Sequence, residues 1–97
     1  MKRQGDLLIV RVDRLPIGAR RIARRILAEG EATGHLHELD CGQVYEKNGG
    51  LYFSVLDSEE AILSHPEHGP LQFERGLWKV IRQREYDPEV HERYVRD

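Results

Sequence analysis

The chain has 97 residues, of which 39% are hydrophobic and 33% are charged, and its formal net charge is −2 at pH 7. This length predicts a single domain, residues 1–97, and excludes separate catalytic and binding modules. A domain of this size buries a thin hydrophobic core, so a bound metal or self-association is a common source of extra stability.

The cysteine content and the N-terminal residues bear on the compartment. Cys41 is the single cysteine, so an internal disulfide is excluded and a reducing compartment is indicated. The first apolar run, Leu7–Val10, is shorter than the apolar part of a signal peptide or a membrane span. We therefore expect a cytoplasmic protein without a membrane partner.

Charge is unevenly distributed along the chain. Residues 1–30 carry eight lysines and arginines against three acidic residues, whereas residues 31–97 carry seven against fourteen. This asymmetry suits a solvated surface, a homo-oligomer with an electrostatic contact, or nucleic-acid binding by the basic segment 20–25. That segment contains Arg20, Arg21, Arg24 and Arg25 without interleaved aromatic residues, which counts against stacking on single strands. We expect a homo-oligomer and place nucleic acid second.

Alternating apolar residues and frequent turn residues predict a mainly β fold, a small barrel or sandwich of about six to seven short strands. The expected strands lie at 7–12, 26–39 with breaks at Gly30 and Gly34, 42–47, 51–56, 61–65, 70–73 and 76–86. Asn48-Gly49 predicts a tight hairpin turn. Segment 19–27 is interpreted as a short helical or irregular connection that becomes a strand near Ile26. The tail, 87–97, is expected to pack loosely.

Four of the five histidines form two pairs, His35-x-His37 and His65-x-x-His68. Side chains two apart on a strand share a face, so the first pair can reach one ion while Leu36 packs inward. Pro66 fixes the backbone that carries the second pair. Because imidazole is the commonest side-chain ligand of zinc and similar metals, the four rings predict a transition-metal site.

Carboxylates accompany both pairs. Glu31 lies four residues before His35, and Glu67 lies within the second pair, so either is a candidate ligand, ligand-orienting residue or general base. Four ligands predict a closed structural zinc site, whereas three ligands and a water would permit hydrolysis.

Each of these features also has a plain structural interpretation. The histidine pairs can be incidental surface residues, and His65 can cap a turn. Cys41 can be a weak ligand or nucleophile, although a small apolar filler is the more frequent role. Residues 83–86, Gln-Arg-Glu-Tyr, can line a polar pocket or form a surface ladder of charges, and His91 is assigned no role.

Three resemblances follow from these motifs. Gly30 with His35-x-His37 resembles the first metal-binding motif of cupins, which are β-barrels that hold a metal with two histidines, a glutamate and a later histidine; here Glu38 follows His37 sooner than in that motif. Residues 5–8 and 30–33 resemble strands of β-clip serine proteases, with His35 where those proteases have a lysine base, which implies a related fold rather than protease chemistry. Residues 30–37, 65–70 and 83–86 together resemble a family of small bacterial proteins without an assigned activity.

The sequence therefore predicts a small β protein that binds zinc or another transition metal through His35, His37, His65 and His68. A non-enzymatic homo-oligomeric assembly module and a metal-dependent hydrolase remain open as alternatives. The substrate, if there is one, is not indicated.

Overall fold

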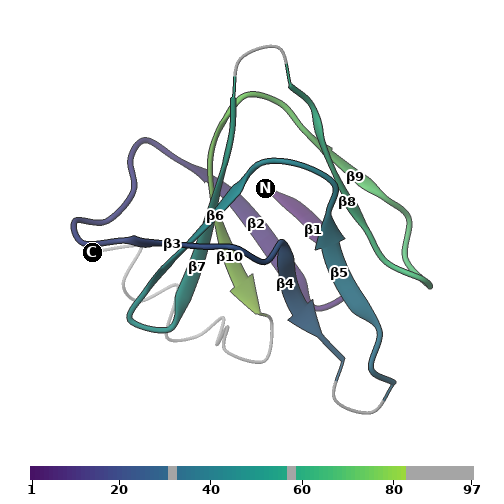
Figure 1. The fold of residues 1–97 in the computed structure, drawn as a ribbon. Coiled ribbons are helices and arrows are strands. Elements are labelled where there is room, and N and C mark those ends of the chain that lie inside the picture. The colour runs from purple at the N-terminus through teal and green to yellow at the C-terminus, as the bar shows by residue number, and fades with distance from the viewer. Residues whose placement is uncertain (31–32, 57–58, 83–97) are drawn as a thin grey trace, which may run out of the picture.

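The computed structural model describes residues 1–30, 33–56 and 59–82, and these residues form ten strands (Figure 1). The strands are β1 Lys2–Gln4, β2 Leu7–Val12, β3 Arg20–Ile22, β4 Ile26–Glu29, β5 Leu36–Leu39, β6 Gln43–Lys47, β7 Gly50–Val55, β8 Ala61–Ser64, β9 Leu71–Phe73 and β10 Gly76–Arg82. Among these residues there is no helix of the length and apolarity that a bilayer crossing requires. The mainly β fold class is confirmed.

The strands form two antiparallel sheets. One sheet has six strands in the order β1-β2-β10-β7-β6-β3, and the other has four in the order β4-β5-β8-β9. Buried residues of both sheets belong to one hydrophobic cluster, so the sheets pack as a sandwich and are not closed into a barrel.

The described residues hold more strands than the six or seven expected. The expected strand 26–39 is two strands, β4 and β5, and β1 and β3 were not expected. The helical or irregular interpretation of 19–27 is wrong at β3, which pairs with β6 through Arg20↔Glu46 and Ile22↔Val44. β3 is an edge strand, and charged side chains are common on edges because they oppose pairing with another chain. Because of its arginines, β3 lacks the alternation of apolar and polar residues by which the other strands were predicted.

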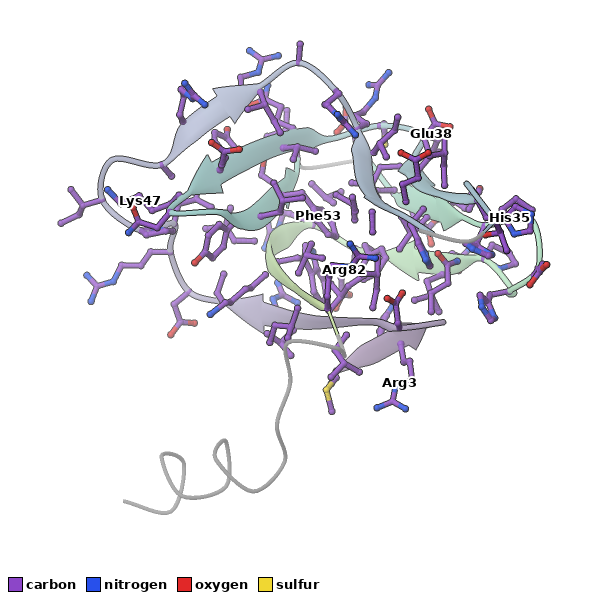
Figure 2. The ribbon with its side chains drawn as sticks, turned by 90° about the horizontal axis from the view of Figure 1, so that it is seen from below. Arg3, His35, Glu38, Lys47, Phe53 and Arg82 are labelled. Atoms are coloured by element: carbon purple, nitrogen blue, oxygen red, sulfur yellow. The ribbon has the colours of Figure 1, made fainter. Side chains whose placement is uncertain are left out.

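The core lies between the two sheets and contains three aromatic rings. Phe53, Phe73 and Trp78 contact one another at ring-centroid distances of 5.1 to 6.4 Å. Trp78 and Val80 are buried while Leu77 and Lys79 are half-buried, because successive side chains of a strand point to opposite faces of the sheet. Figure 2 shows Phe53 in the middle of the molecule.

Two tight turns have the backbone that their sequences require. Asn48 and Gly49 have φ angles of 50° and 80°, which confirms the predicted hairpin turn between β6 and β7. Gly5 and Asp6 link β1 to β2 in a second two-residue turn, with Gly5 at a φ of 57°. This second turn places Asp6 at one end of the sandwich.

Strand register brings distant segments to that same end. β5 pairs with β8 through Leu39↔Leu63 and Glu38↔Ser64, and one further step in this register sets His37 opposite His65. β10 pairs with β2 through Arg82↔Leu7, so Arg82 lies beside Asp6.

Candidate functional site

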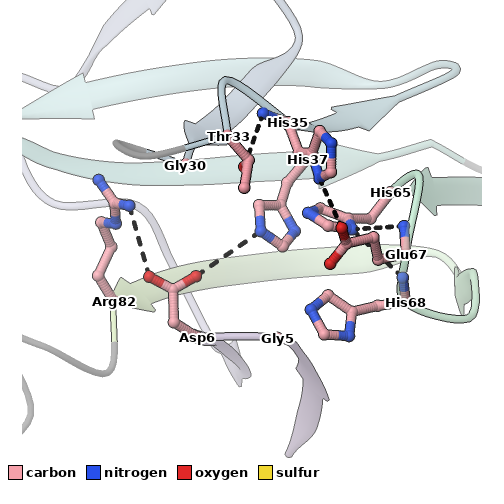
Figure 3. Close-up of a pocket in the computed structure, with 10 residues that line it drawn as sticks. All are labelled: Gly5, Asp6, Gly30, Thr33, His35, His37, His65, Glu67, His68 and Arg82. Carbon is pink, nitrogen blue, oxygen red and sulfur yellow. Dashed lines mark hydrogen bonds and ion pairs between the residues drawn. The ribbon is translucent and has the colours of Figure 1, made fainter.

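All four predicted histidines lie in one open pocket with a volume of about 610 Å³ (Figure 3). His37 is on β5, His35 precedes it, and His65 and His68 belong to the loop after β8. The other described residues that line the pocket are Gly5, Asp6, Gly30, Thr33, Glu67 and Arg82. The two histidine pairs, which are far apart in sequence, are therefore neighbours in the fold.

His65 lies at the centre of the histidine group. Its ring centroid is 4.3 Å from that of His37, 4.6 Å from that of His68 and 5.5 Å from that of His35. The first of these contacts follows directly from the β5–β8 register.

His37 is buried, with its ring held by Gln4. The amide nitrogen of Gln4 donates to the carbonyls of Leu63 and Gly69, at 2.8 and 2.9 Å, which turns the amide oxygen toward His37. This oxygen lies 2.9 Å from Nδ1 of His37. Because an amide oxygen only accepts, Nδ1 must carry the proton and donate it. In the neutral ring, Nε2 is therefore the nitrogen with a free lone pair.

The ring of His37 is neutral at pH 7. Burial, aided by the neighbouring His65, lowers the pKa of His37 from 6.5 to about 4. Its Nε2 lies 3.7 Å from Oδ1 of Asp6, so a lone pair and a carboxylate oxygen are close neighbours in the pocket. The dashed line between these two residues in Figure 3 marks this approach.

The neutral ring of His65 is in the other tautomer from that of His37. Its Nδ1 accepts hydrogen bonds from the backbone N–H groups of Glu67 and His68, at 3.0 and 3.2 Å. Nε2 of the neutral ring therefore carries the proton. Burial and the neighbouring His68 lower the pKa of His65. His65 thus caps the turn that starts the β8–β9 loop, which is the plain structural role considered for it.

His35 and His68 occupy the rim. Nδ1 of His35 lies 3.4 Å from Oε1 of Glu67. His68 is exposed, and its ring lies against Gly5, where a Cβ atom would come within 2.9 Å of both Cδ2 and Nε2. The bare backbone of Gly5 is therefore what lets the β1–β2 turn approach His68.

Arg82 closes the end of the pocket beside Asp6. Its Nη2 lies 3.4 Å from Oδ2 of Asp6 and 3.3 Å from the carbonyl oxygen of Glu29. The two oxygens of Asp6 thus face two different groups, His37 on one side and Arg82 on the other.

Leu36 is half-buried and His37 is the buried residue, so the expectation that Leu36 packs inward is reversed. Glu67 lines the pocket, whereas Glu31, residues 83–86 and His91 lie outside the described residues. Cys41 is half-buried, packs against the core and lies 3.7 Å from the Glu60 carbonyl.

Sequence reasoning missed Gln4, Asp6 and Arg82 as site residues. The Gly-Asp pair before an apolar strand was a turn signal, and a turn that opens onto the histidines could have drawn attention to Asp6. Nothing local marks Gln4 or Arg82. In the described part of the chain, no three His, Cys, Asp or Glu side chains are arranged to hold one metal ion as they stand.

A family model described as "Domain of unknown function (DUF8820)" matches residues 3–83. No curated protein and no solved structure matches the chain.

Proposed function

The chain belongs to the DUF8820 family, and we propose that it binds one transition-metal ion, best zinc, in the histidine pocket. Nε2 of His37 and Oδ1 of Asp6 are the primary ligands. His68, with His35 or Glu67, completes the coordination from the rim.

The facing of His37 and Asp6 is the observation that carries this proposal. Both atoms are electron-rich, they lie 3.7 Å apart, and the Gln4 bond keeps the lone pair of His37 directed away from Nδ1. Zinc bonds to imidazole and carboxylate are about 2.0–2.2 Å. One ion between these two atoms would therefore have an Nε2–zinc–Oδ1 angle of roughly 120°. An ion there would replace repulsion between the two atoms by attraction.

Completion of the site requires movement at the rim. Two ligands do not hold zinc, which takes four in structural sites and three with a water in catalytic ones. His68 and Glu67 are exposed, and rotation of an exposed side chain is a small rearrangement. His65 is removed from the predicted ligand set. Its Nδ1 caps the turn as an acceptor, so the proton of the neutral ring is on Nε2. Zinc bound to Nε2 would displace that proton.

The donor set favours zinc over the hard cations. Neutral imidazole suits zinc, copper, nickel and iron, whereas magnesium and calcium take oxygen ligands. The role we favour is structural, because a metal that binds only the folded chain adds its binding free energy to folding.

Metal titration of the purified, untagged protein tests the proposal. We expect one zinc per chain by elemental analysis, and a loss of affinity of about a hundredfold in His37→Ala and tenfold or more in Asp6→Asn, since loss of a mere outer-shell partner already costs about 10–100-fold. His65→Asn keeps a side-chain acceptor for the turn but removes the ring, and it should bind zinc within about threefold of the parent.

Two control variants separate the site from unspecific binding. Cys41→Ser removes the thiol, and Asp13→Asn removes an exposed carboxylate in the β2–β3 connection. Both should bind zinc like the parent. A parent protein without stoichiometric metal, or equal binding by His37→Ala, would refute the proposal.

A further inference from the structure

Arg82 has hydrogen-bonding capacity that its described contacts do not use. A guanidinium carries five N–H donors and no acceptor. Both described hydrogen bonds of Arg82 come from Nη2, and both are long, at 3.3 and 3.4 Å. Nε is buried and finds no hydrogen-bond partner among the residues that the structure describes. Leaving a charged, half-buried donor group partly unsatisfied is unfavourable unless a ligand engages it.

The Asp6 carboxylate bridges the space between Arg82 and the proposed ion. Its Oδ1 faces His37 and its Oδ2 faces Arg82, so a single carboxylate group spans from the ion position to the guanidinium. A second oxyanion of similar span can therefore place one oxygen on the ion, in place of one rim ligand, and another on Arg82, entering from the open side of the pocket.

The charges in the pocket favour an anion over a neutral ligand. A divalent ion and Arg82 would lie on either side of the Asp6 carboxylate. The other described carboxylate of the pocket, Glu67, lies among the histidine rings on the side away from Arg82, where its Oε1 approaches His35 (Figure 3). Arginine suits this task because its planar fork matches two oxygens of a carboxylate or phosphate.

We propose that the pocket takes a small oxyanion, a carboxylate or phosphate group, held between the bound metal ion and the guanidinium of Arg82. This inference rests on the proposed metal site and names the class of ligand that the site recognises. Thr33, which lines the same pocket, accepts a bond from the His35 N–H through its Oγ1, and a hydroxyl group can donate as well as accept.

Cobalt-loaded protein allows a direct test, because the visible spectrum of Co²⁺ changes when an inner ligand is replaced. Inorganic phosphate and acetate are titrated separately at constant ionic strength, which distinguishes the two sources of oxyanion. We expect saturable spectral change with at least one of them. Arg82→Gln should weaken that binding at least about tenfold, and Arg82→Lys should be intermediate because it keeps charge without the fork.

Arg24→Gln is the matched control, since it removes the same charge from an exposed position outside the pocket. It should bind the anion within about twofold of the parent and Co²⁺ like the parent, and the anion titrations of all variants are made on protein saturated with Co²⁺. Anion binding that is unchanged in Arg82→Gln, or absent from cobalt-loaded parent protein, would overturn this inference and leave the metal site standing. Failure to bind Co²⁺ or zinc at all would overturn both.

Discussion

Gln4 and His37 are joined by a buried 2.9 Å hydrogen bond between the amide oxygen and Nδ1, across 33 positions of sequence. The bond selects one tautomer of His37, because both donors of the amide are already used on the backbone carbonyls of Leu63 and Gly69. A fixed ring with its lone pair on the pocket side is what a metal ligand requires. Gln4 is therefore a positioning residue in the proposed site.

Replacing Gln4 tests that role. Gln4→Leu leaves two carbonyls and the His37 N–H without their partner, so we expect a loss of about 1–3 kcal/mol in the free energy of unfolding. The ring should also populate both tautomers, which ¹⁵N NMR of the imidazole nitrogens detects. Gln72→Leu, at an exposed position on β9, is the control and should change stability by less than about 0.5 kcal/mol. A single unchanged tautomer in Gln4→Leu would contradict the assigned role.

The lowered pKa of His37 predicts how stability depends on pH in metal-free protein kept in chelator. Between about pH 4 and 6.5 the unfolded chain binds a proton at this position and the folded chain does not. The stabilisation is thus complete above pH 6.5 and is lost as the pH falls toward 4, with a ceiling of about 3 kcal/mol. His65, whose pKa is also lowered, contributes in the same direction.

Urea unfolding of the parent and of His37→Gln across this range provides the measurement. Other groups titrate in both proteins, so the difference between the two curves isolates His37. The parent should lose more stability than the variant between pH 6.5 and 4.5. Parallel curves would show that His37 protonates as easily in the folded protein as in the unfolded one.

Gly5 offers a test of the approach between the β1–β2 turn and His68. Gly5→Ala places a side chain at a positive φ, which costs about 1–2 kcal/mol, and also sets a Cβ 2.9 Å from the His68 ring. Gly49→Ala has the same kind of backbone strain at a φ of 80°, with nothing within 4 Å of the added Cβ. Both variants should lose similar stability, but only Gly5→Ala should weaken zinc binding. Equal zinc binding by the two variants would contradict the role of His68 as a zinc ligand.

Self-association remains a prediction from the charge asymmetry and from the open sheet edges, which are β1 and β3 in one sheet and β4 and β9 in the other. Sedimentation should show a homo-oligomer at low salt that weakens at high salt. Arg21→Glu reverses an exposed charge on edge strand β3 and should lower the association constant. A monomer at high protein concentration, whatever the salt, would rule out this assembly.

Local sequence determined most of the strands and the chemistry of the loops. Alternation sets Trp78 and Val80 on one face of β10, which the structure buries, and Asn48-Gly49 specified its turn. Strand faces and positive φ angles depend on a few neighbouring residues. The edge strands β1 and β3 escaped this reasoning. Short strands that pair on one side carry charged residues, and their pattern is too brief to distinguish from a connection.

The arrangement of the candidate site was decided by tertiary structure. The histidines were visible in the sequence as pairs, but only the β5–β8 register brings His37 against His65. Asp6 and Arg82 are 76 positions apart and meet because β2 and β10 are neighbours in one sheet. Side-chain type is local information, whereas which side chains face each other depends on long-range strand pairing. For the same reason the roles of His37 and His65 differ, although each is one member of a histidine pair in the sequence. The ring of His37 is oriented by Gln4 from another strand, and the ring of His65 is oriented by its own turn.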